Sequence, residues 1–209
     1  GLEAALESAL AHWLYHDEIW LRGNAKAKAE ILLAIARVRH ALVLFGGIVP
    51  RKATTHLRAL LNDADAVLLA ADTADEALFR TEVVGAKLAL TEWLVQRGWR
   101  PFLNEAGEKK IAGSFKRFAD IHLSRVAAEL RSAVQHLAVE DAADQLPKLS
   151  RDIDSVQLLA GTYGDAVAPW LENWQELQRA IEHDDRSVFE YFRRQALAAE
   201  PFWLHSGKR

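Results

Sequence analysis

Apolar residues recur at steps of three and four along most of this 209-residue chain. An α-helix advances about 100° per residue, so residues at this spacing share one helical face. In residues 25–45 the recurring side chains are Ile31, Ile35, Val38, Leu42 and Phe45. Nowhere do valine or isoleucine residues alternate with polar ones, as they would in a half-buried strand. We therefore predict an all-α protein of about eight helices.

Glycine, proline and polar clusters predict where these helices begin and end. The expected helices cover residues 2–21, 25–45, 50–68, 77–96, 115–134, 142 or 148 to 160, 170–181 and 186–200. The longest break contains Gly98, Pro101 and the stretch NEAGEKK. We predict that this break separates two helical halves, residues 1–98 and 112–209.

Composition narrows the class of protein. Half of the residues are hydrophobic, none is cysteine, and the formal net charge is −3. Disulfides, cysteine-ligated zinc and a thiol nucleophile are therefore excluded, and a general nucleic-acid binder, which needs a basic excess, is not expected. Without a signal-peptide pattern or a sufficiently long apolar run, we expect a cytoplasmic protein with no membrane contact. Because the chain opens on Gly1 rather than methionine, we expect it to be part of a longer protein.

The segment from Phe115 to Val134 places charged residues where an amphipathic helix would have apolar ones. Helical geometry puts His122, Arg125 and Glu129 within the apolar stripe. Burying an unpaired cation costs several kcal/mol. The sequence therefore predicts either a closed polar network, in which Glu129 pairs with Arg125, or a wet, charged cavity between helices.

Other basic side chains lie on or beside predicted apolar stripes. Arg39 borders the stripe of residues 25–45, and Lys87 lies within the stripe of residues 77–96, where it either binds an anion or extends its amine to water. The remaining candidates flank these positions: Arg37, His40, Lys52, His56 and Arg58.

The sequence contains no recognisable catalytic or metal-binding motif. His12 and His16 are interpreted as part of a solvated helix face. Asp63 and Asp65 point apart on a helix, so they do not form a metal site. We predict no catalytic residue, metal or cofactor in this chain.

Several long segments, in order, resemble the CHAD domain, the helical domain that follows the CYTH domain in bacterial inorganic triphosphatases. The segments that carry the resemblance are ARVRHALVLFGGIVPRKATTHLRALL, KLALTEWLVQRGWRPFL, SFKRFADIHLSRVAAELRS, LPKLSRDIDSVQLLAG and EPFWLHSGKR. The resemblance implies two antiparallel four-helix bundles with a pseudo-twofold relation, and a basic surface or channel that binds inorganic polyphosphate. It also implies an upstream CYTH domain, which would carry any triphosphatase activity and any Mg²⁺.

The family's basic motif is only partly present. Its arginines match Arg37 and Arg39, but its leading histidine and first arginine fall on Ala29 and Leu32. In the second half His122 and Arg125 match, whereas Glu129 replaces the expected lysine. The proposed polyphosphate ligands are, in full, Arg37, Arg39, His40, Lys52, His56, Arg58, Lys87, Lys116, Arg117, His122 and Arg125.

Three functions stay open at this stage. The first is a polyphosphate-binding accessory domain, in which cations bind phosphate by charge-assisted hydrogen bonds of about 1.5–3 kcal/mol each. The second is a structural domain that positions the catalytic domain without tight ligand binding, which the incomplete motif and the acidic net charge favour. The third, an independent phosphohydrolase, is the least favoured because the acidic residues are scattered along helix surfaces.

Overall fold

The computed structural model describes residues 2–96, 105–160 and 163–204, of which residues 105–117, 164 and 204 are described by their backbone alone. Every regular element in these ranges is helical, which confirms the all-α prediction. The chain divides into two compact units, Leu2–Ile111 and Ala112–Arg209. We call them the N-terminal and the C-terminal bundle and describe each by itself.

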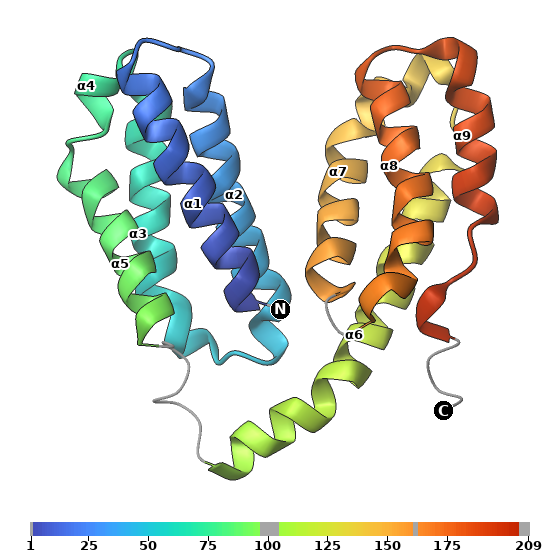
Figure 1. Ribbon diagram of the computed structural model, residues 1–209, viewed down its shortest axis with the longest axis horizontal. Coiled ribbons are helices and arrows are strands. Elements are labelled where there is room, and N and C mark those ends of the chain that lie inside the picture. The colour runs from blue at the N-terminus through green and yellow to red at the C-terminus, as the bar shows by residue number, and fades with distance from the viewer. Residues whose placement is uncertain (1, 97–104, 161–162, 205–209) are drawn as a thin grey trace. The chain divides into compact units, whose positions relative to one another are not determined.

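Four long helices form the N-terminal bundle (Figure 1). They are α1 (Leu2–Leu21), α2 (Ala27–Leu44), α3 (Arg51–Ala70) and α5 (Thr81–Val95), with the short helices η1 (Phe45–Gly47) and α4 (Ala74–Ala77) between them. α1 packs on α2, α2 on α3, α3 on α5, and α5 on α1, so the four helices close around one core. The apolar residues predicted to share a face of α2 are all buried in that core.

The connections of this bundle follow from local chemistry. Gly23 ends α1 with a φ of 99°, a conformation that glycine adopts without a steric penalty. Lys28 donates hydrogen bonds from Nζ to the carbonyls of Leu69 and Ala71, which satisfies acceptors at the end of α3. The Thr73 hydroxyl accepts a hydrogen bond from the Glu76 N–H and starts α4. The helix predicted over residues 77–96 corresponds to α5, which begins only at Thr81, and α4 lies in the polar stretch that precedes the predicted helix.

The C-terminal bundle contains α6 (Glu105–Val134), α7 (Ala142–Leu159), α8 (Ala168–Glu182) and α9 (Arg186–Ala198). Three short 3₁₀ helices lie between or after them: η3 (Val139–Asp141), η5 (Gly164–Val167) and η6 (Phe202–Leu204). α8 packs against both α7 and α9. Its predicted apolar face is buried and consists of Trp170, Trp174, Leu177 and Ile181.

Side-chain hydrogen bonds connect α6 to the later segments of its bundle. The Tyr163 hydroxyl donates to the Asp120 carboxylate, and Trp203 Nε1 donates to Ser124 Oγ at 2.9 Å. Phe202 and Trp203 are both buried and meet Trp170 edge to face. Phe202 and Trp203, which follow α9, are thus part of the core of this bundle.

The predicted break between the halves is partly wrong. α6 begins at Glu105, so most of the NEAGEKK stretch is helical, and the division between the two units falls inside this helix. Glutamate, lysine and alanine are good helix formers, and their summed helix propensity outweighs the unfavourable propensity of the glycine. Gly98 and Pro101 lie outside the described residues. None of the described helices has the length and apolar character required to cross a membrane.

Candidate anion-binding site

One long segment of the N-terminal bundle carries only positive charge. Between Ile31 and Asn62 the sequence has no aspartate or glutamate. The basic side chains of this segment are Arg37, Arg39, His40, Arg51, Lys52, His56 and Arg58. It comprises most of α2, the turn η1 and the first half of α3, and the two helices pack against each other. We call it the basic hairpin.

The N-terminus of α3 is the point of the basic hairpin best suited to an anion. Pro50 stands at the N-cap and supplies no side-chain hydrogen bond. The hydroxyls of Thr54 and Thr55 donate to the Arg51 carbonyl, and the Ala53 N–H donates to the Pro50 carbonyl at 2.9 Å. Arg51 and Lys52 are exposed in this turn. The N-terminus of a helix carries a partial positive charge, so cations there are unfavourable unless an anion binds beside them. The backbone N–H groups at the helix start that have no carbonyl partner also favour a bound anion.

The other predicted ligands of the hairpin differ in their surroundings. Lys52 and His56 are exposed and Arg58 is half-buried, and none of these three forms an ion pair with a described residue. Arg39 lies 3.4 Å from the Asp65 carboxylate, measured from Nη1 to Oδ2. Arg37 is exposed, His40 is half-buried, and neither is without an interaction partner.

Lys87 lies inside the bundle, as its position in the apolar stripe indicates. Its Nζ is 2.6 Å from Oδ2 of Asp17 on α1, and the two side chains are only 18% and 11% exposed. Burial raises the pKa of Asp17, and the Lys87 hydrogen bond and charge oppose that rise. The amine of Lys87 therefore neither reaches bulk water nor stands free for an anion.

On α6 the prediction of three inward-facing polar residues is wrong for two of them. The side chains of Arg125 and Glu129 are 62% and 46% exposed and form an ion pair at 3.8 Å. The buried stripe contains Leu123, Val126, Leu130 and Val134, and at 100° per residue it is turned around the helix from the predicted arc, with which it shares Val126. The prediction centred the apolar arc on Phe115 and extended it to Phe118, on the side where Arg125 and Glu129 lie, whereas the buried residues lie on the other side of Phe115.

His122 is half-buried and stacks on Phe118 with the ring centres 4.2 Å apart. Burial and the nearby Arg125 lower the pKa of His122. The two basic residues are adjacent, with 3.4 Å between Arg125 Nη2 and His122 Nδ1. Lys116 and Arg117 belong to the helical part of α6 whose side chains lie outside the described residues.

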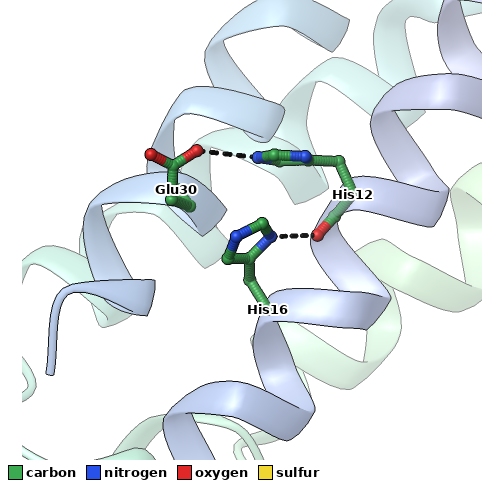
Figure 2. A group of neighbouring side chains, drawn as sticks. All are labelled: His12, His16 and Glu30. Atoms are coloured by element: carbon green, nitrogen blue, oxygen red, sulfur yellow. Dashed lines mark hydrogen bonds and ion pairs between the residues drawn. The ribbon is translucent and has the colours of Figure 1, made fainter. Parts of the chain in front are cut away.

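Sequence reasoning missed two features. Arg51 is not among the predicted ligands, although a basic first turn after proline could have indicated an anion site. His12 and His16 are half-buried and face Glu30 of α2, rather than forming a solvated face (Figure 2). Their i, i+4 spacing was visible in the sequence, but the position of Glu30 depends on the packing of α1 on α2.

Together these observations define an all-helical domain of two bundles, one of which presents an acid-free basic hairpin. The family model named CHAD domain matches residues 4–194, and the chain belongs to this family. The chain is also similar to the crystal structure of the CHAD domain from the plant Ricinus communis, with a TM-score of 0.52 and 17% identity. That match covers 94% of this chain and 84% of the other, and at this identity it shows a shared fold alone.

Proposed function

We propose that this domain binds inorganic polyphosphate, or a comparable phosphate-rich anion, through the basic hairpin. The observation that carries the proposal is the acid-free segment from Ile31 to Asn62 in a chain whose net charge is −3. Within it, the N-terminus of α3 combines two exposed cations with N–H groups that no side chain caps. Among such anions, the resemblance to the CYTH–CHAD triphosphatases favours polyphosphate.

The chemistry suits a linear phosphate polymer. Arginine can bind two phosphate oxygens side by side, and lysine acts as a compact point charge. Arg51 and Arg58 are seven residues apart, so they lie on nearly the same face of α3 and about 10 Å apart along it. Successive phosphates could therefore contact both. α1 begins and α5 ends at this end of the bundle (Figure 1), and the first turn of α1 and the last turn of α5 each contain a glutamate, so we expect micromolar rather than tighter affinity.

The proposed role is accessory rather than catalytic. Phosphoryl transfer uses carboxylates that hold Mg²⁺ opposite basic groups, and the basic hairpin itself contributes no carboxylate. In this role the domain would gather or hold the polymer for an upstream CYTH-type domain of the same protein.

A second candidate is a structural domain that positions such a neighbour without binding an anion. The observation that favours it is the pairing of the predicted inner cations within their own bundles. Arg39, Lys87 and Arg125 each contact a carboxylate. Their charge is thus largely neutralised, and only the hairpin cations at the start of α3 distinguish the two candidates.

Titration with long-chain polyphosphate at several salt concentrations tests the proposal. We expect affinity to fall with salt, with log K changing by about 0.7 per log unit for each phosphate neutralised. Lys52→Ala should weaken binding severalfold and flatten this dependence. Lys26→Ala is the matched control, because Lys26 is an exposed lysine at the start of α2 and outside the basic hairpin. Equal effects of the two substitutions, or no binding at low salt, would favour the structural role.

A further inference from the structure

Three potential metal ligands from two helices meet on the N-terminal bundle. His12 and His16 lie one turn apart on α1, and Glu30 lies in the first turn of α2. One ligand atom from each residue lies within 4.8 Å of the other two. Figure 2 shows the three side chains pointing toward one another at the contact between the helices. All three are half-buried.

The ring of His16 is already oriented for metal binding. Its Nδ1 lies 2.8 Å from the backbone carbonyl oxygen of His12. A carbonyl oxygen only accepts, so Nδ1 carries the proton and Nε2 keeps its lone pair. Metal-binding histidines commonly have this arrangement, in which a backbone acceptor holds the non-ligating nitrogen. The His16–carbonyl contact therefore fixes both the tautomer and the direction of the ring.

The other two ligands are already in contact. His12 Nε2 lies 2.8 Å from Glu30 Oε2, and without a metal this contact is a hydrogen bond from the ring to the carboxylate. A metal would replace the shared proton, which moves to Nδ1 of His12 through solvent. In a tetrahedral zinc site with bonds near 2.0–2.1 Å, ligand atoms are about 3.3 Å apart. The three side chains reach that spacing by small rotations, which their partial exposure allows.

From this geometry we infer that His12, His16 and Glu30 bind a divalent transition-metal ion of the zinc class. Two imidazoles and one carboxylate are a recognised zinc donor set, and water completes the fourth position. Imidazole donors favour zinc, cobalt and nickel over magnesium and calcium. The ion joins α1 to α2, so it stabilises the N-terminal bundle. This site is independent of the proposed polyphosphate binding.

Titration of chelator-treated protein with Co²⁺, followed by competition with Zn²⁺, tests the site. We expect one ion per chain, micromolar affinity and the intense visible absorption of four-coordinate Co²⁺. Affinity should decline as the pH falls, because protons compete with the metal for its ligands. Glu30→Gln keeps the side-chain shape and removes the anionic ligand, so it should lower affinity at least about tenfold. Zn²⁺ should also raise the melting temperature of the unaltered chain.

His183→Gln is the matched control, because His183 is exposed and belongs to the other bundle. It should bind Co²⁺ as the unaltered chain does. His16→Gln should abolish the visible absorption while the helical circular dichroism is retained. The inference is overturned if the apo protein takes up no Co²⁺ at micromolar concentration, or if Glu30→Gln and His16→Gln bind it as well as His183→Gln does.

Discussion

Replacing Lys87 by methionine should destabilise the N-terminal bundle through Asp17. Methionine keeps most of the packed stem and removes the ammonium group, so the main loss is the partner of a buried carboxylate. Removing one member of a buried ion pair typically costs 3–5 kcal/mol. Because the Lys87 side chain is 18% exposed, we take the lower end and expect about 3 kcal/mol.

The same substitution should make stability depend on pH in a defined direction. Burial already raises the pKa of Asp17, and Lys87 opposes that rise, so Lys87→Met raises the pKa further. Above the raised pKa the unpaired Asp17 carboxylate is charged, and the full loss of unfolding free energy is present. As the pH falls through the raised pKa, Asp17 takes up a proton in the folded state and the loss shrinks. The free energy difference should therefore be smaller at pH 4 than at pH 8.

Urea unfolding measures this difference in both proteins at the two pH values. Hydrogen exchange of peptides from α1 shows whether the loss falls on the N-terminal bundle. Asp17→Asn combined with Lys87→Met should recover most of the stability, because it replaces the pair by neutral groups. The reasoning is refuted if Lys87→Met costs less than about 0.5 kcal/mol, if its cost is the same at both pH values, or if Asp17→Asn gives no recovery.

Three further predictions concern the C-terminal bundle. Trp174→Ala should cost about 3–5 kcal/mol in urea unfolding, since the side chain is 1% exposed; a loss below about 1 kcal/mol would contradict its place in the core. Arg193 donates to two backbone carbonyls at the end of α6, so Arg193→Ala should cost about 1 kcal/mol and speed hydrogen exchange there, whereas Arg194→Ala should not. In NMR titrations His122 should titrate below its usual 6.5, and Arg125→Ala should move that value upward; no upward movement would exclude the charge effect. Because the folded state favours neutral His122, its contribution to stability should be lost as the pH falls below about 6.5.

The helices could be predicted because their signals are local. The buried face of α2 and the tryptophan face of α8 follow from the 3.6-residue repeat, and both predictions are confirmed. The exact starts of α4 and α6 could not be predicted. They depend on the hydroxyl cap at Thr73 and on helix propensity summed over a segment that contains glycine.

The candidate site was harder to predict because pairing across helices is a tertiary property. The stripe calculation correctly placed Lys87 inward, but nothing near it in sequence indicates Asp17, which lies 70 residues away. The same limit applies to Glu30 beside His12 and His16. For Arg125 the error lies in the position of the apolar stripe, because the buried residues of α6 lie on the other side of Phe115 from Arg125. Which of the predicted cations bind polyphosphate stays a prediction.

Hydrogen exchange with and without long-chain polyphosphate tests the central claim most directly, because it reports both whether the anion binds and where. If polyphosphate binds the basic hairpin, amide exchange should slow at the N-terminus of α3, around Arg51 and Lys52. Adding salt should reverse this protection. No change in exchange, or protection confined to the C-terminal bundle, would contradict it.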